Sequence, residues 1–371
     1  MLSPVRKREV ARAAQVLLSR HGVDMSRQID VFELVHKVGL VLRFKQLEGL
    51  LGAFVPGVRG GILVNSERSI PLQRYTAAHE IGHWALHLAE FSLDSEQEVD
   101  GTTPDRLEQE AQLFASHLLM PLPLISRAAR DADIRLGVAP TGEQIYKIAG
   151  TMGVSFTAAI VHLQNVNLLT REHATAAKRI RPVSIQVSRT FGERLIPTDA
   201  HVWSPSEFHS TAVRDLYVGD IVAVDLPENR TTGYRWFVSA PAPELPVTDE
   251  AEDLELGILE EYDEDEEPVE GPAIAFDSFR ADGAPAGKNE LAVSGIDPFV
   301  AVGNGGRRRL LIRASRDGQW RAILSYAPAH RPGDAIETTV LDAETHPRPA
   351  LQQRRYQIDS YNRRSDGEVT T

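Results

Sequence analysis

The most informative absence in this sequence is cysteine. The 371 residues contain none, which excludes a disulfide scaffold, a cysteine nucleophile and thiolate ligands for zinc or an iron–sulfur cluster. Any zinc site must therefore use histidine and carboxylate ligands. Long apolar runs are missing as well. A membrane span needs about 18 consecutive apolar residues, and no segment of this sequence is that long. The N-terminus has only a short apolar run, so we expect no signal peptide and a cytoplasmic protein.

Outside one segment the sequence has almost no net charge. The formal net charge is -12, but residues 249–270 alone contain 13 Asp or Glu and no Lys or Arg. The rest of the chain is nearly neutral, so its acidity does not argue against nucleic acid as a partner. Such a block of like charge is usually solvated and disordered. The alternative is that it folds over the basic stretch at 178–181, or over a metal cleft, and restrains activity.

The first part of the chain has a helical beginning, followed by short strands and longer helices. Apolar residues recur at helical spacing in the longer segments, and glycines indicate a turn before the third strand. Pro121 and Pro123 end the last long helix. The patterns predict helices over 4–22, 29–38, 71–89 and 103–120, and strands over 41–45, 52–55 and 62–65.

Residues 141–170 have a helix-turn-helix shape. Gly153 lies at the turn and Ser155 can cap the second helix. One interpretation is contact with DNA. We favour a packing or substrate-docking role, because the segment is short and only the basic residues after it supply positive charge.

From Val183 to about residue 345 the pattern becomes strand-like and rich in turns, which predicts an all-β domain. We therefore expect an α+β chain. Its predicted parts are a first domain at 1–135, a helical segment with a basic linker at 136–182, a β domain at 183–348 that contains the acidic insertion, and a polar tail at 349–371.

The strongest chemical signal is His79-Glu80-Ile81-Gly82-His83 inside a predicted helix. Residues four apart lie on one helix face, so both imidazoles can reach one metal ion. Glu80 lies beside them, where it can act as general base on a water molecule that zinc activates. Strands precede the helix, as a zincin metallopeptidase site requires. This context disfavours the alternative of a surface helix with two incidental histidines.

Two histidines leave such a site incomplete, because catalytic zinc usually has three protein ligands and a water. His87 is about 12 Å from the first histidine along the helix axis, which is too far to share the ion. We expect it to support a ligand, to face the substrate or to be purely structural. The next helix offers Glu108, Glu110 and His117. The two glutamates flank its apolar stripe on opposite sides, so periodicity does not choose between them.

Two segments, Tyr75–His87 and Glu110–Pro121, resemble the ImmA/IrrE family of zinc metallopeptidases. The first contains His-Glu-x-x-His. The second reads Glu-Ala-Gln-Leu-Phe-Ala-Ser-His-Leu-Leu-Met-Pro, with Gln112 where the family more often has Asn. The resemblance covers roughly residues 1–170, including the helix-turn-helix shape.

This resemblance implies a ligand set, a mechanism and a class of substrate. The implied zinc ligands are His79, His83 and Glu110, with Glu80 as the catalytic base that takes a proton from water and passes it to the leaving amine. Family members cleave particular regulatory proteins, which implies a helix-turn-helix repressor as the protein substrate.

Three loops between predicted strands of the second half resemble the binding loops of the chagasin family of cysteine-peptidase inhibitors, an immunoglobulin-like sandwich. The match covers about residues 212–345, with Arg230 in place of the usual Pro and Gly333 in place of the usual Trp. The resemblance implies partner contacts at Asn229, Thr231, Thr232, Gly233, Tyr234, Gly303, Gly305, Gly306, Arg331 and Pro332.

Loss of the Trp anchor weakens any grip on a peptidase, since such anchors often contribute about 2 kcal/mol. We therefore favour a sandwich that serves recognition or stability over an inhibitor.

The combined expectation is a zinc endopeptidase whose C-terminal sandwich selects or restrains its target. The alternative is a non-catalytic regulator with structural zinc that binds DNA or protein, or an inhibitor of a separate cysteine peptidase. Glu80 favours the enzyme, because a purely structural zinc site needs no general base.

Overall fold

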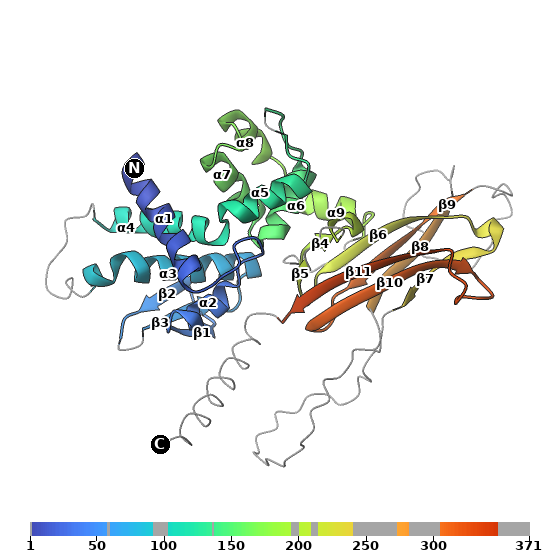
Figure 1. The fold of residues 1–371 in the computed structure, drawn as a ribbon, viewed down its shortest axis with the longest axis horizontal. Coiled ribbons are helices and arrows are strands. Elements are labelled where there is room, and N and C mark those ends of the chain that lie inside the picture. Colours follow the sequence, from blue (N-terminus) through green and yellow to red (C-terminus); the bar gives the residue numbers. More distant parts are fainter. Residues whose placement is uncertain are drawn as a thin grey trace, which may run out of the picture. The chain divides into compact units, whose positions relative to one another are not determined.

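The computed structural model describes residues 2–57, 60–91, 103–135, 137–193, 200–208, 214–239, 273–281 and 305–347. These residues form two compact units, one drawn mainly from residues up to 201 and the other mainly from 202–346 (Figure 1). Helices and strands are mixed, as the α+β prediction requires. Three predicted features lie outside the described residues: the acidic insertion 249–270, Gly303 and the tail 349–371.

The first unit begins with helices and a small sheet. Its first elements are α1 (Pro4–Arg20), α2 (Val31–Lys37), β1 (Val41–Lys45), β2 (Gly52–Val55), β3 (Gly61–Asn65), α3 (Ile70–Phe91) and α4 (Thr103–Leu119). The strand order is β1-β3-β2, with β1 parallel and β2 antiparallel to the central β3. All three strands agree with the predicted ranges to within one residue, because alternating apolar residues and flanking glycines specify them locally.

The helices α3 and α4 approach closely at Gly82 and Ala111. A methyl group added to Gly82 would lie 3.1 Å from Cα of Ala111 and 3.3 Å from Cβ of Phe114. Glycine therefore allows the two helix backbones to come together at this point. Because Gly82 lies between His79 and His83 in α3, the crossing brings the first turns of α4 over the histidines.

Further helices complete the first unit. They are α5 (Leu122–Asp131), α6 (Gly142–Met152), α7 (Phe156–Asn165), α8 (Arg171–Ala177) and α9 (Pro182–Arg189). Pro121 and Pro123 separate α4 from α5, since proline ends one helix and fits the first turn of the next.

The helix-turn-helix shape is formed by α6 and α7. Gly153 adopts the left-handed conformation between them (φ 62°), and Ser155 caps α7. The buried Arg74 of α3 donates hydrogen bonds to the carbonyl oxygens of Gly153 at 2.9 Å and Ile29 at 2.7 Å. Apolar residues of α6 and α7 belong to the same core as those of α3 and α4. The segment is thus packed into the first unit.

The prediction of strand-like structure from Val183 is wrong at its start, because α9 occupies this region. The sequence Val-Ser-Ile-Gln-Val alternates apolar and polar residues as a half-buried strand does. Pro182 instead begins a helix, and in that helix only Ile185 is buried. The first strand after the helices is β4 (Val202–Trp203).

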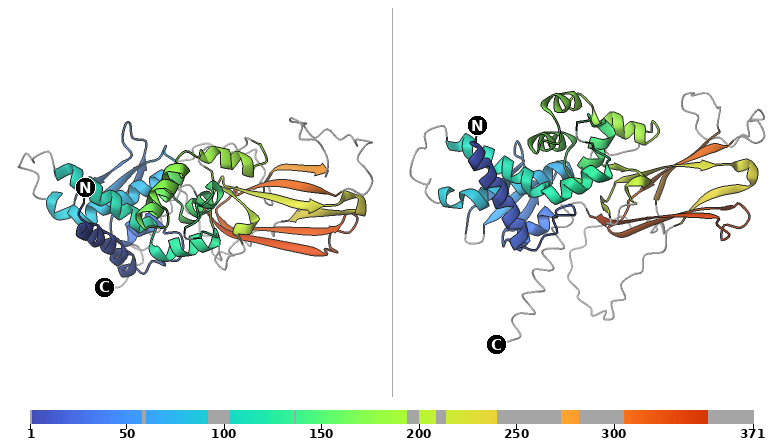
Figure 2. Two further views of the ribbon diagram at one scale, coloured as in Figure 1. Left: turned by 90° about the horizontal axis from the view of Figure 1, so that it is seen from above. Right: turned by 45° about the horizontal axis from the view of Figure 1, so that its top comes forward.

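Two four-stranded sheets form the second unit, and Figure 2 shows them as separate layers. One has the order β5-β11-β10-β7 and the other β4-β6-β9-β8. A single core lies between them, with Val222, Leu310 and Ile312 from one sheet and Trp236, Leu324 and Leu341 from the other. The strands beyond β4 are β5 (Arg214–Tyr217), β6 (Ile221–Glu228), β7 (Tyr234–Ser239), β8 (Ala273–Ala281), β9 (Gly306–Arg313), β10 (Gly318–Pro328) and β11 (Glu337–His346).

None of the helices in the described part of the chain is long and apolar enough to cross a membrane.

Candidate metal centre

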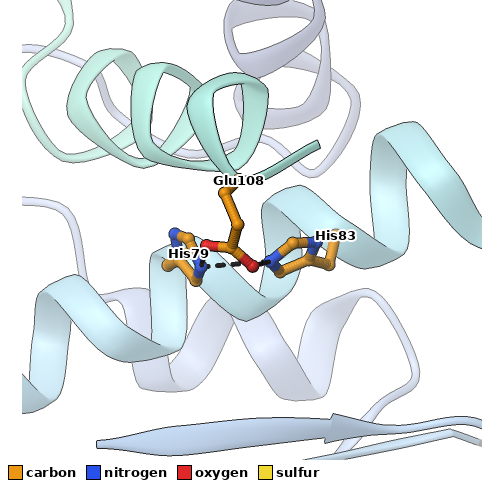
Figure 3. A group of neighbouring side chains, drawn as sticks. All are labelled: His79, His83 and Glu108. Carbon is orange, nitrogen blue, oxygen red and sulfur yellow. Dashed lines mark hydrogen bonds and ion pairs between the residues drawn. The ribbon is translucent and has the colours of Figure 1, made fainter. Parts of the chain in front are cut away.

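Three side chains from two helices converge in the first unit. His79 and His83 lie one turn apart on α3, and their Nε2 atoms are 3.0 Å from each other. Glu108 extends from α4 between them, with Oε2 at 3.2 Å from Nε2 of His79 and Oε1 at 3.2 Å from Nε2 of His83. Figure 3 shows the glutamate carboxylate facing both rings. The three residues therefore present a compact set of nitrogen and oxygen donors.

The donor set fits zinc. With bonds of about 2.0–2.1 Å, neighbouring ligands of a tetrahedral zinc ion lie about 3.3 Å apart. The distance between the two Nε2 atoms is close to this value, and so is the distance from each Nε2 to its nearer oxygen of Glu108. Burial lowers the pKa of His79 and of His83. The imidazoles therefore stay neutral and able to bind a metal near neutral pH. In the described part of the first unit, His79, His83 and Glu108 form a group of donors close enough together to hold one metal ion.

The structure brings Glu108, and not the predicted Glu110, to the histidines. The two glutamates are rotated by about 200° from each other around the helix axis, so they meet different neighbours. Glu110 is fully buried and accepts hydrogen bonds from Arg6 of α1, whose pairing lowers the pKa of its carboxyl group. Sequence periodicity left both glutamates open, and the family resemblance selected Glu110, which in the structure pairs with Arg6 instead of approaching His79 and His83.

Glu80 lies next to the candidate ligands on α3 and is almost completely buried. Burial raises the pKa of its carboxyl group to about 7, against the opposing effect of a hydrogen bond from the backbone of Phe54 in β2. A carboxyl group with such a pKa can accept and return a proton near neutral pH. The position suits a general base.

The other histidines and Tyr75 differ in their relation to this centre. The ring of Tyr75 stacks on His79 at 6.2 Å between centroids. His87 is fully buried, with Nε2 at 3.8 Å from Glu110, so it belongs with that carboxylate. His117 packs edge-on against His162 at 4.9 Å. Tyr75 therefore lies at the candidate centre, whereas His117 packs elsewhere.

The strand β2 lies beside the centre at the edge of its three-stranded sheet. It approaches α3 closely, because a methyl group on Gly52 would overlap Thr76, three residues before His79. The side chain of Asn65 holds the preceding loop through the carbonyl oxygens of Leu47 and Leu50, each at 2.8 Å. The edge strand is thereby fixed relative to α3.

In the second unit, the predicted contact loops lie at one end of the two sheets. Glu228 at the end of β6 pairs with Gly306 at the start of β9. Gly233 lies beside the turn after β10, because its carbonyl oxygen accepts a hydrogen bond from Ala329 at 2.8 Å. The register thus gathers the described members of the predicted set, which are Asn229, Thr231, Thr232, Gly233, Tyr234, Gly305, Gly306, Arg331 and Pro332.

Several polar groups of the first loop are engaged within the unit. The side chain of Asn229 accepts hydrogen bonds from the backbone and the hydroxyl group of Thr231. Arg230 pairs with Glu228 at 2.8 Å and lies over the ring of Phe279 at 4.0 Å. The arginine that replaces the usual proline is therefore turned onto its own sheet.

The N-terminal part of the chain matches a peptidase family, in agreement with the resemblance seen in the sequence. Residues 28–164 match the Peptidase_M78 family, described as IrrE N-terminal-like domain. The radiation response metalloprotease IrrE of Deinococcus deserti is 36% identical over 141 residues, which cover 36% of this chain and 46% of that protein. The protein of the same name from Deinococcus radiodurans is 36% identical over 129 residues, or 34% of this chain and 37% of that protein. The match thus spans less than half the length of these curated relatives.

Solved structures show weaker similarity. A cysteine protease inhibitor from Entamoeba histolytica is 15% identical, with a TM-score of 0.23, and the match covers 40% of this chain and 96% of that chain. A Mycobacterium tuberculosis transcriptional regulator is 15% identical, with a TM-score of 0.31, and the match covers 42% and 46% of the two chains.

Proposed function

We propose that this chain, whose residues 28–164 match a metallopeptidase family, is a zinc-dependent endopeptidase with a zincin-like N-terminal domain. In this proposal His79, His83 and Glu108 hold the zinc ion. The observation that carries the proposal is the convergence of these three side chains beside the buried carboxyl group of Glu80. A purely structural zinc site has no use for such a neighbour.

The chemistry follows from the positions of the side chains. When bound, zinc supplies a Lewis acid that activates water and polarises the carbonyl group of a peptide. Glu80 orients the water and accepts its proton on a carboxylate oxygen as the water attacks the peptide carbon. The same oxygen then returns the proton to the nitrogen of the departing amine. No side chain needs to form a covalent bond with the substrate.

An extended segment of a protein is the substrate that the surroundings favour. The outer side of β2 pairs with no strand in the described part of the chain, and an open strand edge can bind an extended peptide through backbone hydrogen bonds. Leu50, Leu51 and Val55 expose apolar side chains beside this edge, which favours apolar residues in the bound segment. From the family resemblance we infer a regulatory protein, such as a helix-turn-helix repressor, as the target.

For the second unit we propose an immunoglobulin-like, chagasin-like sandwich that selects or restrains the target. The support is the clustering of its loops at one end of two sheets that share a core. Inhibition of a cysteine peptidase is the weaker candidate, because Arg230 stands where the resemblance has Pro and pairs with Glu228 and Phe279 of its own unit.

The test of the enzyme compares the wild-type chain with Glu80→Gln. Bound zinc is measured by elemental analysis, and cleavage is measured on candidate repressors and on a peptide library. We expect equal zinc content and a loss of kcat/KM of about 100-fold or more in the variant, since general-base catalysis contributes that much. A Glu80→Gln variant that cleaves like the wild type would contradict the mechanism. Absence of cleavage by both, with binding of DNA or a protein partner, would support the non-catalytic alternative.

A further inference from the structure

The N-terminal helix α1 contacts α4 through the side chain of Arg6. Its Nε donates a hydrogen bond to Oε1 of Glu110 at 2.9 Å, and its Nη2 donates to Oε2 at 2.6 Å. Glu110 is fully buried, whereas Arg6 remains partly exposed and also pairs with Glu9 at 3.1 Å. Two parallel charge-assisted hydrogen bonds are the geometry in which a guanidinium group holds a carboxylate most firmly.

The other positive or titratable groups near Glu110 are less favourably placed. Nε2 of His87 lies 3.8 Å away, and Nε of Arg106 lies 3.7 Å away on the same helix. A buried carboxylate that loses its main cation is stabilised by moving toward another positive charge. A divalent ion at the histidines of α3 would be such a charge, because Glu110 is only two residues from Glu108.

We propose that Arg6 is a positioning residue of the metal centre. It holds Glu110 away from the metal and so keeps α4 in the orientation that points Glu108 at His79 and His83. This inference rests on the proposed zinc site. It adds to that site a helix that the family match does not include, because the match begins at residue 28 and α1 ends at Arg20.

The test measures zinc affinity in the full chain by competition with a chromophoric chelator. The variants are Arg6→Ala, the double variant Arg6→Ala/Glu110→Gln, and Arg12→Ala as a control at an exposed position of the same helix. We expect Arg6→Ala to weaken zinc binding by about 10- to 100-fold, as loss of support for metal ligands does. The control should match the wild type.

The double variant separates positioning from folding. It contains no uncompensated carboxylate, so its zinc affinity should return to within about threefold of the wild type. The visible absorption of the cobalt-substituted protein should follow the same course, altered in Arg6→Ala and restored in the double variant. If Arg6→Ala does not fold, wild-type affinity in the double variant supports the inference, because removal of the charge then rescues the centre.

Two results would overturn the inference alone. One is a folded Arg6→Ala variant with wild-type zinc affinity, and the other is a double variant that binds zinc as weakly as Arg6→Ala. Absence of zinc binding by the wild type would overturn both this inference and the proposed function. If the expected affinities are found but Glu80→Gln cleaves like the wild type, the proposed mechanism fails and the role of Arg6 stands.

Discussion

At the scale of single residues, Glu108 and Glu110 show how position on a helix determines the role of a carboxylate. Glu108 is half-exposed and has an oxygen 3.2 Å from each of two imidazole nitrogens. Glu110 is buried against a guanidinium group. The helix α4 therefore supplies one carboxylate to the candidate metal centre and a second carboxylate to the ion pair with α1. The two side chains are chemically identical.

The two glutamates give opposite predictions for zinc binding. We expect Glu108→Gln to weaken zinc affinity by about 100-fold or more, because a neutral amide replaces a charged ligand. We expect Glu110→Gln to keep zinc affinity within about tenfold of the wild type and to lower the free energy of unfolding by about 1–3 kcal/mol. Calorimetric titration and urea unfolding provide the two measurements. Loss of zinc in Glu110→Gln alone would restore the assignment that the family resemblance implied.

The sequence indicates one part of this centre better than the other for a physical reason. His79, Glu80 and His83 are carried by one helix, so local spacing is enough to bring them together. The third ligand, a carboxylate, depends on the rotation of α4 about its axis, which packing against α1 and α3 determines. The hydrogen bonds between Arg6 and Glu110 join residues 104 positions apart, and no local pattern reports such a contact.

A second prediction at this scale concerns His162 of α7. It is buried, its Nε2 lies 3.1 Å from the carbonyl oxygen of Met120, and burial lowers its pKa to about 4. The unfolded chain, with a histidine pKa of about 6.5, binds a proton in a range where the native chain does not. Stability therefore falls as the pH drops below about 6.5, and this loss is complete once the pH is below about 4.

We expect His162→Gln to remove this dependence. The glutamine can still donate a hydrogen bond to Met120 but does not titrate, so the variant should lose about 2 kcal/mol less than the wild type between pH 7 and pH 5. Urea unfolding at the two pH values measures the difference. His173→Gln on α8 is the matched control and should behave like the wild type. Equal pH dependence in the wild type and His162→Gln would contradict the prediction.

At the scale of secondary structure, local sequence patterns predict most elements and fail where two patterns coincide. The ranges of β1 and β2 agree with the predictions because glycines bound short alternating runs. The α9 helix reads as a strand because its residues alternate, although only Ile185 is buried in it. Alternating apolar and polar residues indicate a strand only when the apolar face packs against other residues. The sequence alone does not show that the other apolar residues of α9 lack such packing.

The crossing of α3 and α4 provides a prediction for Gly82. In an isolated helix, Gly→Ala stabilises by about 1 kcal/mol. Here the added methyl group would lie 3.1 Å from Cα of Ala111, so we expect Gly82→Ala to destabilise the unit by about 1–3 kcal/mol and to weaken zinc binding. Chemical unfolding and zinc titration test this.

The control for this variant is Ala85→Gly at an exposed position of α3. It measures the effect of glycine on the helix without a crossing, and it should cost about 1 kcal/mol with unchanged zinc affinity. Stabilisation of the chain by Gly82→Ala would show that the two helices have room to separate.

At the scale of the whole molecule, the apolar residues are divided between two separate cores. One core joins the α helices and the small sheet and includes Ile148 of the helix-turn-helix shape. The other lies between the two larger sheets and includes Leu324. Because the predicted peptidase domain and helical segment share the first core, we expect them to unfold together.

Two cores predict two unfolding transitions in calorimetry. Zinc at about 100 times its dissociation constant should stabilise only the first unit, by about 2.7 kcal/mol. Leu324→Ala should lower only the free energy of unfolding of the second unit, by about 2–5 kcal/mol. Ile148→Ala should lower only that of the first, zinc-dependent unit, by a similar amount. A single transition, or a shift of both transitions by zinc, would show that the units are energetically coupled.

The donor set of the candidate centre also bears on oxidative damage. Thiolate ligands are oxidised to sulfenic acids or disulfides, and such ligands then no longer bind zinc. The imidazoles of His79 and His83 and the carboxylate of Glu108 have no corresponding step on that oxidation ladder, and the chain contains no cysteine. Peroxide that inactivates thiolate zinc sites would therefore leave these ligands unchanged. The centre is thus suited to oxidising conditions in which thiolate ligands would lose their zinc.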